Sequence, residues 1–108
     1  FNGKVFVRQE AQKTNAFQQN QNILLSDNAS VYSKPELEIY ADDVKCSHGS
    51  TTGQLNEEAI FYLRSRGISE LSARRIMIQA FAHETLKDIK IEPFKELIEQ
   101  RITENFQF

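Results

Sequence analysis

Hydrophobic and polar positions follow two different periods along this chain, one in residues 1–49 and another in residues 54–106. In the first part, apolar residues alternate with polar ones in short segments, as at Val5 and Val7. A period of two is typical of a β-strand with one buried face. The same alternation, or a short apolar run, recurs at residues 23–25, Val31, Leu37 and Ile39, and Val44 and Cys46. The first part is therefore predicted to consist of short strands.

The segments between these predicted strands favour a stacked solenoid. Residues 9–22 and 26–30 are rich in Gln, Asn and Ser, and we expect turns there, or amide side chains that ladder with identical neighbours. The apolar blocks recur roughly every one to two dozen residues, with few glycine-containing hairpin turns. This pattern indicates a right-handed parallel β-helix rather than a meander of hairpins. Such a solenoid needs roughly three or more rungs, so we expect only its end here.

The rest of the chain carries the start and stop signals of three helices. Asn56 is a predicted N-cap, and Gly67 is the residue expected just after the last turn of that helix. Ser69 is predicted to cap a second helix that extends to about Ile89. Pro93 suits the first turn of a third helix, where its missing N–H costs nothing. Because the predicted loops are short, we expect a compact three-helix bundle.

The helices differ in how many apolar surfaces they present. The third has one apolar stripe that we expect to be buried, made of Phe94, Leu97, Ile98 and Ile102. The second has a polar stripe made of Ser72, Arg75, Gln79, His83, Lys87 and Lys90. Its apolar flanks are Ala73, Met77, Ala80 and Phe81 on one side and Leu71, Ile78, Ala82 and Ile89 on the other. Two flanks need two covering surfaces, so this is either the central helix of the bundle or a helix that binds a partner protein.

Composition argues against several classes of function. A net charge of −2 provides no basic surface for nucleic acid. A single cysteine cannot form an internal disulfide, and no apolar run approaches the roughly 20 residues that span a membrane. We therefore expect a cytoplasmic protein with neither nucleic acid nor membrane as a partner. The chain begins at Phe1, inside an apparent β region, so we expect an excised C-terminal piece of a longer protein.

Residues 42–50, "DDVKCSHGS", contain the candidate chemistry. On a strand, Cys46 and His48 would share one face, where a thiolate and an imidazole can both bind a metal. A structural zinc site needs four ligands, and no second pair is present, so we expect no metal in the isolated chain. His83 lies on a polar helical stripe and is expected in solvent. Asp42 and Asp43 would point to opposite faces and are expected to shape a turn.

Three other interpretations of this stretch remain open. In the first interpretation, Cys46 is a small buried hydrophobic residue and His48 is a turn residue before a glycine. In the second, the two residues form a self-contained metal site. In the third, Cys46 acts as a nucleophile with a histidine and an aspartate, but neighbours on one strand face do not give the geometry that a triad needs.

The run "LEIYADDVKCSHGSTTGQLNEEAIFYLRSRGIS", residues 37–69, resembles the C-terminal part of the SufB/SufD family of the Suf iron–sulfur cluster assembly machinery. The segment "KCSHG" is similar to the SufD branch of that family rather than the SufB branch. The resemblance implies an α+β fold: the end of a right-handed parallel β-helix in residues 1–53, followed by a C-terminal three-helix domain in residues 54–108.

The same resemblance implies a non-catalytic scaffold. SufB would pair with the β part, and SufC, an ABC-type ATPase, would dock on one face of the helices within residues 54–106. His48, with Cys46 beside it, would lie at the interface shared with SufB. An iron–sulfur cluster would be present transiently in the full complex, and no cofactor is expected in the isolated chain. The open β edge would also make self-association a risk.

Overall fold

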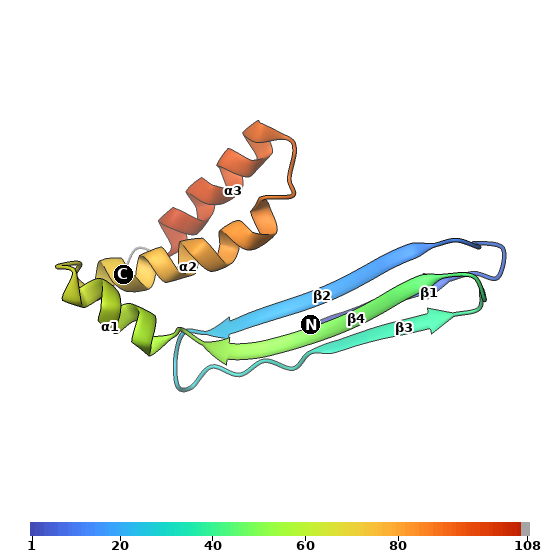
Figure 1. Ribbon diagram of the computed structural model, residues 1–108, viewed down its shortest axis with the longest axis horizontal. Coiled ribbons are helices and arrows are strands. Elements are labelled where there is room, and N and C mark those ends of the chain that lie inside the picture. Colours follow the sequence, from blue (N-terminus) through green and yellow to red (C-terminus); the bar gives the residue numbers. More distant parts are fainter. Residues whose placement is uncertain (107–108) are drawn as a thin grey trace. The chain divides into compact units, whose positions relative to one another are not determined.

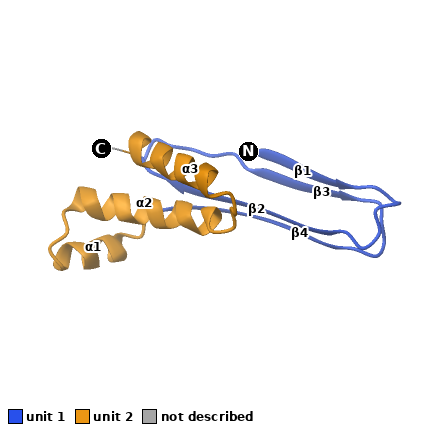
Figure 2. Cartoon of the chain, turned by 90° about the horizontal axis from the view of Figure 1, so that it is seen from above, with its two compact units in different colours: residues 1–54 blue, residues 55–108 orange. Residues whose placement is uncertain are grey.

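The computed structural model describes residues 1–106 and has four strands followed by three helices (Figure 1). The chain divides into two compact units, a β unit at Phe1–Gln54 and a helical unit that begins at Leu55 (Figure 2). The predicted α+β class is confirmed. None of the helices within residues 1–106 is long and apolar enough to cross a membrane.

The β unit consists of two separate pairs of parallel strands. Its strands are β1 (Asn2–Val7), β2 (Asn15–Leu24), β3 (Lys34–Ile39) and β4 (Lys45–Gln54). β1 pairs with β3 and β2 pairs with β4, both parallel, and the two pairs are visible as two layers in Figure 2. Asn2 lies opposite Lys34, an offset of 34 − 2 = 32 residues, and Asn15 lies opposite Lys45, an offset of 45 − 15 = 30. Successive strands begin at residues 2, 15, 34 and 45, which are 13, 19 and 11 residues apart and fit the expected recurrence of roughly one to two dozen residues.

Turns are present at residues 9–10, 12–13 and 27–28, as expected, but strand β2 occupies residues 15–22, where the turn prediction is wrong. Its alternation is concealed because polar amides occupy the less exposed positions, among them Asn20 and Asn22. The Oδ1 atom of Asn20 accepts hydrogen bonds from Asn22 Nδ2 at 2.7 Å and from Ser33 Oγ at 2.8 Å. Because these amides satisfy each other and the following loop, they can line the inner face of a strand. The bond between Asn20 and Asn22 lies within one strand and is not a ladder of identical neighbours.

The even-numbered residues of β2 face the β1–β3 layer. A Cβ atom on Gly3 of β1 would lie 2.7 Å from the amide nitrogen of Gln18, so these two residues lie against each other. Asn20, two residues along, bonds to Ser33 in the segment that leads into β3. Val7, 3% exposed, and Ala41, 7% exposed, are the buried apolar residues of this unit. Position along β2 and β4 therefore determines whether a side chain faces the other layer or solvent.

The three helices begin where the capping signals predict. They are α1 (Glu57–Ser65), α2 (Glu70–Leu86) and α3 (Glu92–Asn105). The side chain of Asn56 accepts a hydrogen bond from the backbone N–H of Ala59 at 3.0 Å, and Ser69 accepts one from Ser72 at 3.2 Å. Pro93 lies in the first turn of α3, as predicted. Helix α2 ends at Leu86, three residues before the predicted end at Ile89.

Helix α1 ends in a Schellman motif centred on Gly67. Gly67 has φ = +90°, its N–H donates to the carbonyl of Arg64 at 2.9 Å, and the N–H of Ile68 donates to the carbonyl of Leu63 at 3.2 Å. This confirms the prediction that Gly67 follows the last turn. The motif redirects the chain within two residues, so α2 begins immediately afterwards.

The helical unit is less tightly packed than the predicted bundle. Helix α2 contacts both α1 and α3, which confirms its central position. The buried apolar residues of the described part of this unit are Leu55, Ile60, Ala73, Ile78 and Leu86. None of the 14 residues of α3 is buried, and Phe94 and Leu97 are each 50% exposed. The predicted burial of the α3 stripe is wrong because α2 is its main neighbour, and one helix cannot cover a wide apolar stripe.

Candidate functional site

Cys46 and His48 lie on one face of β4 and not in a turn. The ladder between β2 and β4 continues without a break from Asn15 opposite Lys45 to Leu24 opposite Gln54, so the alternation of side chains is regular. Residues 46 and 48 therefore point to the same side. Cys46 is partly buried and His48 is exposed. The interpretation of His48 as a turn residue is wrong, because β4 continues six residues beyond it.

The residues opposite this pair are a small one and a large amide. Ala16 lies opposite Cys46, and Gln18 lies opposite His48. Alanine has only a methyl group, so it leaves room over the thiol. The next position along the face is polar: the hydroxyl of Ser50 forms a 2.8 Å hydrogen bond with that of Ser33. The thiol of Cys46, the imidazole of His48 and the amide of Gln18 thus lie on one face of the β2–β4 sheet.

Gln18 is a site residue that the sequence interpretation missed. Its side-chain oxygen is buried and accepts no hydrogen bond. In the sequence, Gln18 is one of many amides in a segment that looks like turn material. Only the pairing of β2 with β4, residues 30 positions apart, places it opposite His48.

Neither the aspartates nor the other histidine completes a metal site with this pair. Among residues 1–106, no group of three or more His, Cys, Asp or Glu side chains is placed to hold a metal ion. Asp42 and Asp43 are exposed in the bend between β3 and β4. The backbone N–H of Asp43 donates to Gln12 Oε1 at 3.0 Å, and its carbonyl accepts from the N–H of Lys13 at 2.6 Å. The two aspartates therefore lie in a bend, and the backbone of Asp43 joins this bend to residues 12 and 13. His83 is exposed on α2.

A charged cluster on the solvent-facing side of the β1–β3 sheet shifts the pKa values of Lys4, Glu38 and Tyr40. The carboxylate of Glu38 accepts hydrogen bonds from the hydroxyl of Tyr40 and from Lys4 Nζ, the latter at 3.2 Å. The Tyr40 hydrogen bond is the main reason that the pKa of Glu38 is lowered, followed by that of Lys4. The same carboxylate raises the pKa of Tyr40 and of Lys4. These groups are on the solvent side and have no link to Cys46 or His48.

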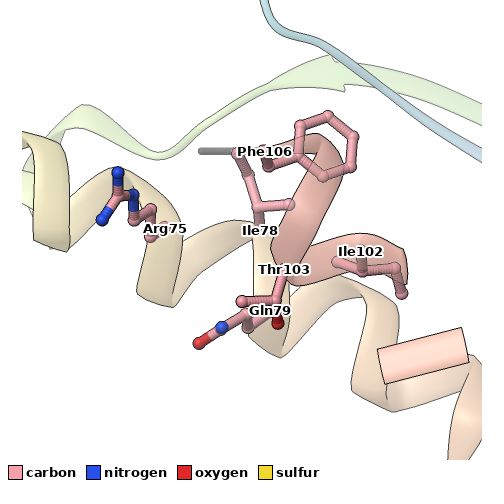
Figure 3. Close-up of a pocket in the computed structure, with 6 residues that line it drawn as sticks. All are labelled: Arg75, Ile78, Gln79, Ile102, Thr103 and Phe106. Atoms are coloured by element: carbon pink, nitrogen blue, oxygen red, sulfur yellow. The ribbon is translucent and has the colours of Figure 1, made fainter. Parts of the chain in front are cut away.

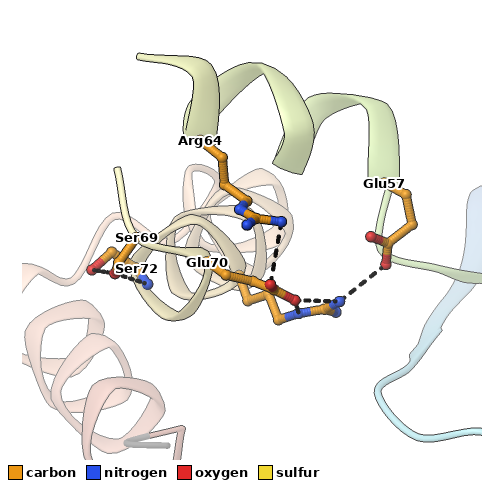
Figure 4. A network of polar contacts seen from close by, with 6 residues as sticks. Glu57, Arg64, Ser69, Glu70 and Ser72 are labelled. Atoms are coloured by element: carbon orange, nitrogen blue, oxygen red, sulfur yellow. Dashed lines mark hydrogen bonds and ion pairs between the residues drawn. The ribbon is translucent and has the colours of Figure 1, made fainter. Parts of the chain in front are cut away.

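The junction between α1 and α2 is held by a network of ion pairs. The carboxylate of Glu70 lies 3.4 Å from Arg64 and 3.3 Å from Arg74, and Arg74 also lies 3.2 Å from Glu57 (Figure 4). All four side chains are at least one-third exposed, so each pair contributes little by itself, about 0.2–1 kcal/mol. The network links both helices and supports the turn that Gly67 makes.

Large apolar side chains are exposed on α1. Phe61 is 73% exposed and Tyr62 is 58% exposed, and the guanidinium carbon of Arg66 lies 5.6 Å from the centroid of the Tyr62 ring. Leu71 at the start of α2 is also partly exposed, at 42%. We call Phe61 and Tyr62 the aromatic surface of the helical unit. Exposed aromatic residues beside an arginine are typical of protein-binding surfaces.

Two cavities lie between α2 and α3. One, of about 220 Å³, is lined by Arg75, Ile78, Gln79, Ile102, Thr103 and Phe106 (Figure 3). The other, of about 420 Å³, shares Gln79, Ile102 and Thr103 and adds His83 and Glu99. The hydroxyl of Thr103 donates to the carbonyl of Glu99 within the helix, at 2.9 Å. These cavities are gaps that the loose packing of α3 leaves, and they contain no cluster of metal-binding groups among the described residues.

The family model described as "SUF system FeS cluster assembly, SufBD core domain" matches residues 1–81. The chain therefore belongs to the SufBD family, as predicted. It is 49% identical over 94% of its length to the iron–sulfur cluster assembly protein SufD of Escherichia coli. It is 48% identical over 95% of its length to an iron–sulfur cluster assembly SufBD family protein of Synechocystis.

A relative with lower identity also matches nearly the whole chain. A SufBD family protein of Pyrococcus horikoshii is 37% identical over 96% of the chain. The chain spans about a quarter of the length of these three relatives, at 24%, 23% and 24%. The similarity to the E. coli protein supports the predicted relation to SufD.

Proposed function

We propose that this chain is part of a non-catalytic SufD-type scaffold for iron–sulfur cluster assembly. The observation that carries the proposal is the 49% identity to E. coli SufD over 94% of the chain. In this proposal, the β unit pairs with SufB and the helical unit docks the SufC ATPase, which hydrolyses ATP. The chain itself holds no resident cofactor, and the cluster is a transient product of the assembled complex.

We further propose that the β unit is the end of a right-handed parallel β-helix. Two parallel pairs with offsets of 32 and 30 residues are what two successive coils of one solenoid would produce, with each coil supplying a strand to both layers. Each two-stranded sheet has open edges, and stacking of further coils would cover them. Crystallographic determination of the whole protein tests this; antiparallel neighbours at the free edge of β1 would contradict it.

The proposed role of Cys46 and His48 is to contribute to a site that SufB completes. The two residues share a face, His48 is exposed, and no third metal-binding side chain of the described residues joins them. Two ligands are fewer than the four that an iron–sulfur cluster or a structural zinc ion usually takes from protein. We expect His48→Ala to lower the cluster yield of the assembled complex without unfolding the protein. An unchanged yield would contradict the interface role.

Metal analysis separates this scaffold from a self-contained metal-binding protein. The scaffold proposal expects the isolated chain to contain less than stoichiometric iron and zinc after purification without chelators. Stoichiometric metal that is lost in both Cys46→Ala and His48→Ala would favour the alternative.

The aromatic surface is the proposed docking site for SufC. Phe61 and Tyr62 expose apolar area that the helical unit does not cover itself. We expect the protein to co-elute with purified SufC in size-exclusion chromatography at tens of micromolar. Phe61→Ala should weaken this co-elution, whereas Thr85→Ala, also at an exposed helical position, should not. Failure to co-elute, or equal effects of the two variants, would contradict the assignment.

A further inference from the structure

Gln18 and His48 form a cross-strand pair on the face that also bears Cys46. They lie directly opposite each other in the unbroken ladder between β2 and β4. Neighbouring strands are about 4.8 Å apart, so the end of a glutamine side chain can reach the imidazole of the facing residue. Both side chains point to the same side of the sheet because the register has no bulge. Geometry therefore allows a hydrogen bond between the two groups.

The side-chain carbonyl oxygen of Gln18 has no hydrogen-bond donor. Its Oε1 atom is buried and accepts no hydrogen bond, and a buried acceptor without a donor is destabilising. Its amide nitrogen lies at the surface of Gly3, where a Cβ atom would be only 2.7 Å away. The hydroxyls further along the face are already used, since Ser33 bonds to Asn20 and Ser50 bonds to Ser33. The imidazole of His48 is the donor group directly opposite.

We propose that Gln18 is a positioning residue for His48. A change of side-chain rotamer that brings the Gln18 Oε1 atom to one ring N–H of His48 would give this oxygen its donor, and the bond would select a single neutral tautomer of His48. In that tautomer the second ring nitrogen carries a lone pair. Histidines that bind metals generally have such an outer partner, which fixes ring orientation as well as tautomer. The free nitrogen is then presented beside Cys46, ready to bind iron. The use of His48 in cluster assembly rests on the proposed function, whereas the effect of Gln18 on the His48 tautomer rests only on the structure.

The tautomer of His48 can be measured directly in the intact protein. Imidazole ¹⁵N shifts, with assignment by His48→Ala, distinguish a fixed tautomer from an exchanging mixture. We expect one dominant tautomer in the unchanged protein and a mixture in Gln18→Leu, which removes the acceptor. Gln18→Glu keeps an acceptor oxygen and should restore the fixed tautomer. Gln19→Leu is the matched control, because Gln19 is the next residue on β2 and is exposed on the opposite face.

His83 supplies an internal reference, since it is exposed on α2 and should give the same spectrum in every variant. If Gln18→Leu does not fold, as judged by circular dichroism, Gln18→Met provides a side chain of similar length without an amide. Identical His48 spectra in the unchanged protein and in the folded acceptor-free variant would overturn the inference.

Cluster assembly separates this inference from the proposed function. If both hold, Gln18→Leu should lower the yield about tenfold and Gln19→Leu should leave it unchanged. If the tautomer depends on Gln18 but His48→Ala gives a normal yield, the positioning role stands and the proposed function fails. If His48→Ala abolishes assembly while Gln18→Leu changes neither tautomer nor yield, the positioning role fails alone.

Discussion

Replacement of Gly67 by alanine should destabilise the helical unit through the backbone alone. Gly67 has φ = +90°, and a Cβ atom built there would meet nothing within 4 Å. The substitution therefore creates no clash with another residue. Its cost is the left-handed conformation itself, about 1–2 kcal/mol for a residue with a Cβ atom. Loss of chain entropy in the unfolded state offsets about 0.4–1 kcal/mol of this. We expect a net loss of roughly 0.5–1 kcal/mol.

Other glycine replacements provide the controls. A Cβ atom on Gly53 of β4 would also meet nothing within 4 Å, and Gly53 does not have a positive φ. Gly53→Ala should therefore be neutral or stabilising by a few tenths of a kcal/mol or more. Gly67→Asn should cost less than Gly67→Ala, because asparagine tolerates the left-handed region better.

Urea unfolding followed by helical circular dichroism measures these differences, and amide exchange in α1 and α2 localises them. The Gly67→Ala transition should shift to lower urea with an unchanged slope. Equal stability of Gly67→Ala and the unchanged protein would refute the reasoning that the Schellman turn needs glycine. Weaker binding of SufC by the same variant would further connect the turn to the proposed docking surface.

Two further predictions concern burial and pH. Ile60 is 2% exposed, so Ile60→Ala should cost about 2–4 kcal/mol in urea unfolding, whereas Ile76→Ala, at 40% exposed, should cost much less; similar losses would contradict the assigned core. Because the pKa of Glu38 is lowered from 4.5, its ionised form stabilises the fold above that value, and the contribution is lost as pH falls through the lower folded pKa. Tyr40→Phe removes the main cause and should raise the Glu38 pKa in a carboxyl NMR titration, while Tyr32→Phe, at an exposed tyrosine outside this cluster, should not.

Local signals in the sequence were sufficient to predict the helix starts and the class of fold. Asn56, Ser69 and Gly67 act through hydrogen bonds and backbone angles within a few residues of themselves, so their roles can be recognised without tertiary information. The family resemblance also rests on a contiguous run, residues 37–69, and the SufBD family match confirms it.

Only the tertiary structure decided which residues meet across the β unit. Three of the inner positions of β2, Gln18, Asn20 and Asn22, are amides, so no apolar alternation marked the strand, and turns were predicted in its place. The pairing of Gln18 with His48 depends on a parallel register between residues 30 positions apart, which no local pattern encodes. Burial of Phe94 and Leu97 likewise depends on what covers α3, and α2 leaves each of them half exposed. Helix caps and turns depend on residues close together in the chain and can be predicted from the sequence. Contacts between distant segments depend on how the strands and helices pack, so only the tertiary structure determines them.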